Sequence, residues 1–184
     1  ARMMGRGKTY FISTYGCQAN ERDSETLAGI LDELGFTPNE TAEGSDVIII
    51  NTCAIRQNAE EKVLGEIGNF KRLYRENKDL IIGVCGCMAQ EEGLVETLLT
   101  KYPQVRLLFG THNIQELPSM LYSCMFEGKK VVKIYSKEGE VYENLPVHRF
   151  GTFKAWVNIM YGCDKFCTYC IVPYTRWAKC KCIW

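Results

Sequence analysis

The chain has 184 residues, and its content of 46% hydrophobic and 24% charged residues predicts a folded core rather than a disordered chain. Basic and acidic side chains both number 22, which argues against a protein that binds nucleic acid over its whole surface. Neither a secretory signal nor a run of roughly 20 apolar residues that could cross a bilayer is evident, so we expect the 10 cysteines to be reduced thiols of a cytoplasmic protein with no membrane attachment.

Strand-like and helix-like segments alternate through the first part of the chain. Apolar and β-branched runs, typical of strands buried on both faces, occur at 8–14, 47–50, 80–84 and 105–109. Apolar residues at helical spacing lie between and after them, at 27–34, 63–74, 94–99 and 114–122. This rhythm predicts an α/β fold, with a parallel sheet flanked by helices on both faces.

Three cysteines share one position in this expected topology. Cys17, Cys53 and Cys87 each follow the end of a different strand, and in open α/β sheets ligands bind at that edge. We therefore expect the three thiols to meet in one crevice. The alternative is that each is a small buried hydrophobe, as free cysteines often are. Cys85 can be read either way from its place in the strand, whereas Cys124 is interpreted as a packing residue.

The region after the last helix has a different pattern. Residues 128–142 alternate charged and β-branched side chains around a glycine, which predicts a hairpin or an extended linker. Pro146 and the segment 148–151 indicate a domain boundary. A further strand is expected at 154–160, leading directly into a cysteine-rich loop.

That loop carries Cys163, Cys167 and Cys170 at CxxxCxxC spacing. Three close thiolates can hold three irons of a [4Fe–4S] cube and leave the fourth iron open to another ligand. Zinc is an alternative, since Cys180 and Cys182 could complete a site, although zinc sites usually pair two CxxC units. A disulfide scaffold is a weaker alternative in a chain of this length without a secretion signal.

The loop resembles the signature of radical S-adenosylmethionine (SAM) enzymes, in which an aromatic residue, here Tyr169, precedes the last cysteine. Motifs elsewhere in the chain make the resemblance more specific. They are Thr14–Asn20 (TYGCQAN), Asn51–Arg56 (NTCAIR), Gly86–Gln90 (GCMAQ), Gly110–Ile114 (GTHNI) and Ile171–Arg176 (IVPYTR).

Together these motifs, over residues 8–176, resemble the radical SAM methylthiotransferase family. The resemblance implies two [4Fe–4S] clusters and SAM as cofactors. It makes the three strand-end cysteines the ligands of an auxiliary cluster that handles the inserted sulfur, and the three loop cysteines the ligands of the SAM-binding cluster. It places Tyr169 near the SAM adenine. It assigns no side chain of this chain a catalytic role.

The TYGCQ and THNI forms resemble the members of the family that act on isopentenylated adenosine in tRNA, rather than those that methylthiolate a ribosomal protein or act on threonylcarbamoyl-adenosine. The implied reaction adds a methylthio group to C2 of an isopentenylated adenosine next to the anticodon. The implied partners are tRNA and an electron donor such as a flavodoxin or ferredoxin, and we expect a monomer.

The resemblance divides the chain into a cluster-binding domain at 1–127, a linker or hairpin at 128–150 and the start of a radical SAM barrel at 151–184. Ala19 departs from the usual methionine, with little expected consequence. The tail 177–184 departs completely, and only the first strand of a barrel is present, so we expect the chain to be a fragment that is inactive alone. Two other interpretations remain open: a non-catalytic iron–sulfur or metal-binding α/β module, and a flavodoxin-like nucleotide-binding domain.

Overall fold

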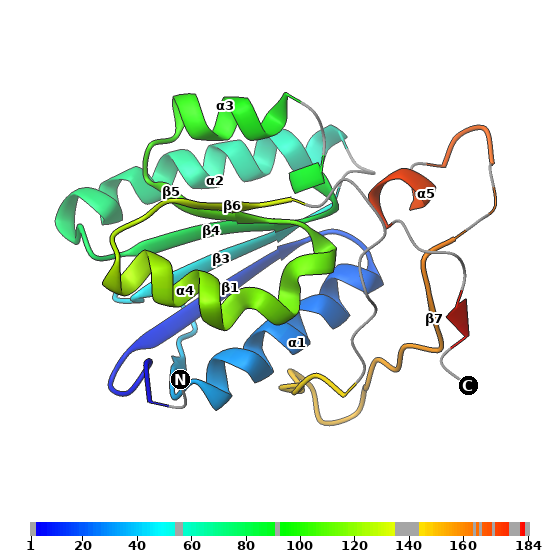
Figure 1. The fold of residues 1–184 in the computed structure, drawn as a ribbon, viewed down its shortest axis with the longest axis horizontal. Coiled ribbons are helices and arrows are strands. Elements are labelled where there is room, and N and C mark those ends of the chain that lie inside the picture. Colours follow the sequence, from blue (N-terminus) through cyan, green and yellow to red (C-terminus); the bar gives the residue numbers. More distant parts are fainter. Residues whose placement is uncertain are drawn as a thin grey trace.

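A parallel β-sheet between two layers of helices forms the body of the protein in the computed structural model (Figure 1). The structure describes residues 3–53, 57–90, 93–134, 144–163, 165, 167–170, 172–176 and 181–182. Within these residues the main sheet has six strands in the order β2-β1-β3-β4-β5-β6, all parallel. The strands are β1 (Thr9–Tyr15), β2 (Thr37–Pro38), β3 (Val47–Thr52), β4 (Ile81–Gly86), β5 (Val105–Phe109) and β6 (Val131–Lys133).

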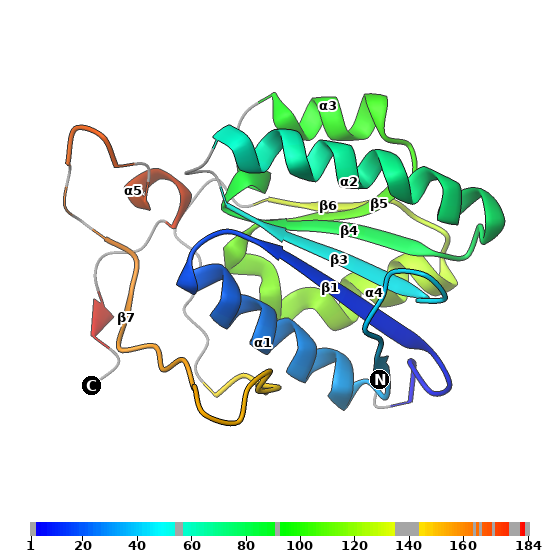
Figure 2. The ribbon, with the colours of Figure 1, turned by 180° about the vertical axis from the view of Figure 1, so that it is seen from behind.

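Helices connect the strands and cover both faces of the sheet. Figure 2 shows α2 and α3 on one face and α1 and α4 on the other. The main helices are α1 (Gln18–Glu33), α2 (Gln57–Glu76), α3 (Leu94–Lys101) and α4 (Leu117–Phe126), with short 3₁₀ turns at η1 (Cys87–Gln90) and η2 (Thr111–Glu116).

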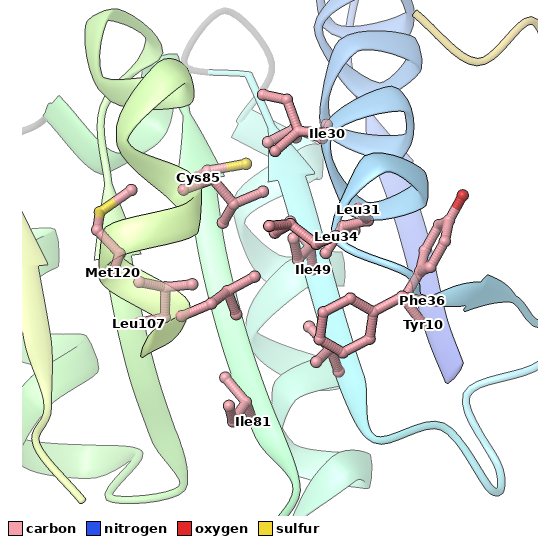
Figure 3. Close-up of a cluster of buried hydrophobic side chains, with 14 of the residues drawn as sticks. Tyr10, Ile30, Leu31, Leu34, Phe36, Ile49, Ile81, Cys85, Leu107 and Met120 are labelled. Atoms are coloured by element: carbon pink, nitrogen blue, oxygen red, sulfur yellow. The ribbon is translucent and has the colours of Figure 1, made fainter. Parts of the chain in front are cut away.

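The central position of β3, covered by helices on both faces, explains why residues Val47–Ile50 are apolar without interruption. Ile49 packs with Leu31 and Met120 in the layer under α1 and α4, which Figure 3 shows in close-up. Ile48 and Ile50 point to the opposite layer, under α2 and α3. Since successive side chains of a strand point to opposite faces, a strand covered on both sides needs apolar residues at every position. The four expected strands and the helices on both faces are therefore confirmed.

At the start of the range 128–142, the structure has a strand of the main sheet where a hairpin or linker is expected. Residues Val131–Lys133 form β6, which pairs in parallel with β5 through the register Leu107↔Val131. The β-branched pair Val131 and Val132 thus satisfies its backbone hydrogen bonds at the free edge of β5. The expected turn around residue 139 lies outside the described residues.

The strand expected at 154–160 is mostly wrong. The structure has only β7 (Met160–Tyr161), which pairs antiparallel with β8 (Lys181–Cys182). Residues 154–158 have no strand structure. A strand needs a partner edge for its backbone groups, and the side chains of Lys154 and Trp156 instead bind the Glu21 carboxylate of α1, at 3.3 and 3.1 Å. That β7 begins a barrel stays a prediction.

Residues 145–157, called here the strap, run alongside α1. The His148 backbone N–H donates to the carbonyl oxygen of Glu25 at 2.9 Å. The His148 ring and Asp32 are paired at 2.5 Å, and Arg149 pairs with the Glu25 carboxylate at 2.6 Å. The strap passes so close to the helix that a Cβ added to Gly29 would lie 2.5 Å from the Pro146 backbone. These contacts attach the C-terminal third of the chain to α1.

Candidate metal centre

The strand register brings Cys17, Cys53 and Cys87 to one edge of the sheet. Tyr15 of β1 is paired with Thr52 of β3, and Thr52 is paired with Gly86 of β4. Cys53 and Cys87 follow directly after those paired positions, and Cys17 comes two residues after its own. Three parallel strands that end in register therefore deliver three thiols to the same place, as the topology predicted.

Cys53 lies at the middle of this set. Its thiol hydrogen-bonds to Cys17, which lowers the pKa of Cys17 to about 5 against the opposing effect of burial. Its hydrogen bond to Cys87 lowers the pKa of that thiol to about 6, again against burial. The Cys53 thiol has one proton and donates it to one neighbour at a time, so the protonation of Cys17 and that of Cys87 are linked through it. Negative charge is therefore favoured at this edge at neutral pH.

The N-terminus of α1 stabilises the first of these thiolates. Cys17 is the residue that caps the helix, and the backbone N–H groups of Asn20 and Ala19 donate to its sulfur. The Asn20 side chain accepts a hydrogen bond from the Cys17 backbone N–H at 3.3 Å. A helix N-terminus favours negative charge, as in other low-pKa cysteines. In a flavodoxin-like domain a phosphate would bind such backbone donors; here the Cys17 sulfur accepts them.

Two glycines next to the cysteines allow this close approach. A Cβ on Gly16 would lie 2.8 Å from the Cβ of Cys53. A Cβ on Gly86, which has φ +102°, would lie 2.1 Å from the carbonyl oxygen of Thr52. Larger residues would push the strand ends apart, so glycine is required at both positions if the thiols are to meet.

A buried amide network holds the end of β3 to α1. The Asn20 side-chain amide donates to the Asn51 side-chain oxygen at 3.0 Å and to the Thr52 carbonyl at 3.1 Å. The Asn51 amide donates to the Asn20 carbonyl at 2.8 Å and to Ser24 Oγ at 2.9 Å. Both asparagines are inaccessible to solvent. The structural role of these asparagines was not predicted. Their positions within the TYGCQAN and NTCAIR motifs were the sequence signal that could have indicated it.

Cys85 and Cys124 lie outside the site. Cys85 packs among the hydrophobic side chains under α1 and α4, as Figure 3 shows. The positive φ of Gly86 breaks the strand alternation that would otherwise point Cys85 and Cys87 the same way. Burial raises the pKa of Cys85 well above its ordinary value, and burial also raises that of Cys124. Both are neutral packing thiols, as expected for Cys124.

Arg176 reaches the three-cysteine site from the C-terminal segment. It follows α5 (Val172–Thr175), which contacts η1 and lies beyond the strand ends in Figures 1 and 2. Its guanidinium pairs with the Asp23 carboxylate at 2.6 Å and hydrogen-bonds to Cys87. His112 lies close to this pair; burial lowers the pKa of His112, and the charge of Arg176 lowers it further. These residues were not predicted as part of the site, because no local pattern connects residues so far apart in sequence.

The loop cysteines are less enclosed. Cys163 and Cys170 are half-buried and Cys167 is exposed. A turn closed by the Cys170 backbone N–H and the Cys167 carbonyl, at 3.1 Å, brings these two residues close together. Tyr169, at the tip of this turn, is 91% exposed. Among the described residues, no contact places Cys163 against the other two cysteines. The cluster-binding role of the three cysteines and the SAM-binding role of Tyr169 stay predictions.

The thiols that the zinc interpretation would add cannot be placed. Cys180 lies outside the described residues, and the side chain of Cys182 is not described.

A pocket of about 460 Å³ opens beside Gly16, between α1 and the strap. It gives space next to the Cys17 end of the site. Its walls are Thr14, Gly16, Glu21, Glu25, Phe150, Gly151, Lys154 and Trp156.

The chemistry of the three sheet-edge thiols decides whether they suit the expected cluster. Among the described residues, no group of three His, Cys, Asp or Glu side chains surrounds a common centre as a ready metal site. The thiols instead contact one another in pairs through Cys53. Their chemistry fits iron, because iron–sulfur clusters take thiolates and two of these three thiols have lowered pKa values. In the same described part of the chain, no helix is long and apolar enough to cross a membrane.

Fold and site together define a class: a parallel α/β domain with three cysteines converging at the carboxyl edge of its sheet. Residues 9–110 match the model of a family described as "Uncharacterized protein family UPF0004". The match covers more than half of the chain, and the chain belongs to this family.

Curated relatives extend the similarity beyond that domain. Proteins named tRNA-2-methylthio-N(6)-dimethylallyladenosine synthase are 59% identical in Bacillus cytotoxicus and in Staphylococcus saprophyticus, each over 175 residues. The protein of that name in Bacillus licheniformis is 58% identical over 175 residues. Each alignment covers 95% of this chain and 34% of the relative, so the chain spans about a third of their length. These relatives confirm the resemblance to the methylthiotransferases.

Proposed function

We propose that this chain is the N-terminal part of a radical SAM tRNA methylthiotransferase, which adds a methylthio group to C2 of isopentenyladenosine next to the anticodon. The observation that carries the proposal is the convergence of Cys17, Cys53 and Cys87 at one sheet edge in a chain with relatives of that name. tRNA is then the substrate, a small electron-transfer protein is the partner, and the cytoplasm is the compartment. A monomer is sufficient, since no second copy is needed to complete either cysteine set.

Cys17, Cys53 and Cys87 would hold one [4Fe–4S] cluster through three thiolates, and Cys163, Cys167 and Cys170 would hold the other. Three ligands leave one iron of each cluster open, for sulfur in the first case and SAM in the second. Tyr169 would lie against the SAM adenine. When bound, these groups supply the inserted sulfur and the one-electron chemistry that activates an inert C–H bond.

The chain's own residues prepare the first site. Gly16 and Gly86 let the strand ends approach, and the Asn20–Asn51 network fixes the end of β3 relative to α1. The Cys53 thiol and the α1 N-terminus keep Cys17 deprotonated, which is the form that binds iron. The site thus has thiolates in place before metal arrives.

Iron and acid-labile sulfide per chain after anaerobic reconstitution test the proposal. We expect about eight irons in the unsubstituted chain, about four in C163A and about four in C53A. C85A is the matched control, because Cys85 is a neighbouring buried thiol outside the site, and it should keep about eight irons. Zinc in place of iron, or unchanged iron in each of C17A, C53A and C87A, would overturn the proposal.

The second candidate is a metal-binding module without catalysis, which the hydrogen-bonded thiols at the sheet edge favour because they need no other part of an enzyme to bind metal. Turnover of isopentenylated tRNA with SAM and a reductant excludes it, and we expect none from the chain alone. A chimera decides the enzyme assignment: residues 1–176 replace the matching segment of the Bacillus cytotoxicus relative, and tRNA is analysed by mass spectrometry. 2-Methylthio-N6-isopentenyladenosine should form in the tRNA with the chimera and its C85A variant and be absent with C53A. A chimera that binds two clusters but makes no product would contradict the assignment.

A further inference from the structure

Arg176 and Asp23 form a buried ion pair between distant parts of the chain. Their side chains are 12% and 5% exposed, and Arg176 Nη2 lies 2.6 Å from Asp23 Oδ2. Asp23 belongs to the early part of α1, beside the Cys17 end of the site. Arg176 lies six positions after Cys170, the last loop cysteine. The pair therefore joins the segment that carries one cysteine set to the domain that carries the other.

The guanidinium also belongs to the surroundings of the first cysteine set. It hydrogen-bonds to the Cys87 sulfur and acts on Cys17 through its charge. Asp23 acts on the Cys87 thiol with the opposite charge. The two charges of the pair thus act on one sulfur atom, that of Cys87: the cation favours negative charge on it and the carboxylate opposes it.

Net charge, hydrogen bonds to the sulfurs and solvent exposure set the reduction potential of an iron–sulfur cluster. A cation that donates a hydrogen bond to a ligating sulfur stabilises the reduced cluster and raises the potential. A carboxylate at the same place lowers it. Burial strengthens both effects, because water does not screen them.

We propose that Arg176 and Asp23 are positioning residues that tune the reduction potential of a cluster held by Cys17, Cys53 and Cys87 and tie that site to the loop carrying Cys163, Cys167 and Cys170. The first half rests on the proposed function, since it needs the cluster. The second half needs only the fold.

A redox titration tests whether the pair tunes the potential. The titration is monitored through the electron paramagnetic resonance signal of the reduced cluster. It uses the chain with Cys163, Cys167 and Cys170 changed to alanine, so that the signal comes from the first site alone. R176Q should shift the potential to more negative values and D23N to more positive values. The control pair is R149Q and E25Q, which breaks another ion pair of α1. Neither charge is among those that shift the pKa of Cys17 or Cys87, so the potential should stay unchanged.

The opposite signs separate tuning from a merely structural role, which would move both variants in the same direction. Shifts of one sign, or no shift in either variant, overturn the proposal. If R176Q retains no iron, R176K is compared with it. Iron binding restored in R176K supports the need for a cation at this position, and iron still absent from R176K overturns the proposal.

Hydrogen exchange on the iron-free full chain tests the second half, whatever metal binds. The Arg176 backbone N–H bonds to the Val172 carbonyl at 2.9 Å, so its exchange reports on α5. Loss of a buried ion pair should speed this exchange at least about tenfold in both R176Q and D23N, and not in R149Q. Unchanged exchange overturns the connection. Absence of iron from the unsubstituted chain would refute the proposed function while leaving this result standing.

Discussion

Gly86 lies directly against the backbone of Thr52: a Cβ on Gly86 would be 2.1 Å from the Thr52 carbonyl oxygen, and its φ is +102°. This contact joins the ends of β4 and β3 just before Cys87 and Cys53. No side chain can occupy the space, and no L-residue adopts that φ without strain. The distance between the two cysteines therefore depends on this glycine.

We predict that G86A lowers the free energy of unfolding by at least about 2 kcal/mol, because strain and a clash with backbone add together. G44A is the matched control, since Gly44 has φ +77° and open space around its Cβ position. It should cost about 1 kcal/mol, the price of the left-handed conformation alone. Urea unfolding of the metal-free chains measures both. Equal losses would mean that the strand ends are not packed as the structure shows.

We predict that Cys17 is the most reactive thiol of the sheet domain in the metal-free chain. The Cys53 hydrogen bond lowers its pKa to about 5, so Cys17 is a thiolate at pH 7 and loses reactivity only as the pH falls through that value. Cys85 and Cys124 are buried and have raised pKa values, so they should stay unmodified.

Iodoacetamide labelling with peptide mapping between pH 4 and 9 checks this order. C53A removes the donor and should move the reactivity of Cys17 to higher pH, while C124A should leave it unchanged. Labelling of Cys85 before Cys17, or a Cys17 profile that C53A does not move, would contradict the thiol arrangement.

The main architecture could be predicted from the sequence because each strand and helix is determined by the apolar pattern of its own segment. A run such as Val47–Ile50 must be buried on both faces, and a parallel sheet then puts every strand end on one edge. The meeting of three thiols follows from that topology without knowledge of side-chain contacts. Cys85 could not be resolved in this way, because the positive φ of Gly86 decides where it points.

The errors and omissions concern contacts between distant residues. The segment 154–160 has a strand pattern, but its neighbour in space is helix α1 and not the edge of a sheet. Trp156 therefore donates a side-chain hydrogen bond to Glu21 of α1, and residues 154–158 form no strand. Asp23 and Arg176 are separated by 153 positions, and nothing in either local pattern specifies the other. Such pairings follow from tertiary packing, which hydrophobic periodicity does not encode.

We predict that N51D destabilises the protein by about 2–4 kcal/mol, because it places a charge in a site without solvent and removes two hydrogen-bond donors. Asn51 is 1% exposed, and its amide bonds to Asn20 and Ser24. N69D is the control, since Asn69 is exposed on α2 and should change stability by less than about 0.5 kcal/mol. Thermal unfolding at pH 7 measures both. Because a buried carboxyl is tolerated better when neutral, the N51D deficit should shrink as the pH falls; a deficit that grows would rule out this explanation.

The packing of the strap on α1 predicts whether a glycine-to-alanine substitution in α1 raises or lowers the free energy of unfolding. Replacing glycine by alanine inside a helix normally stabilises by about 0.5–1 kcal/mol. G65A on α2, with open space around Gly65, should behave in this way. G29A should do the opposite, because its Cβ would lie 2.5 Å from the Pro146 backbone and force the strap away from the helix. Urea unfolding gives the sign, and trypsin cleavage after Arg149 and Lys154 should become faster in G29A alone. If G29A stabilises as G65A does, with unchanged cleavage, then the strap does not pack on α1 in solution.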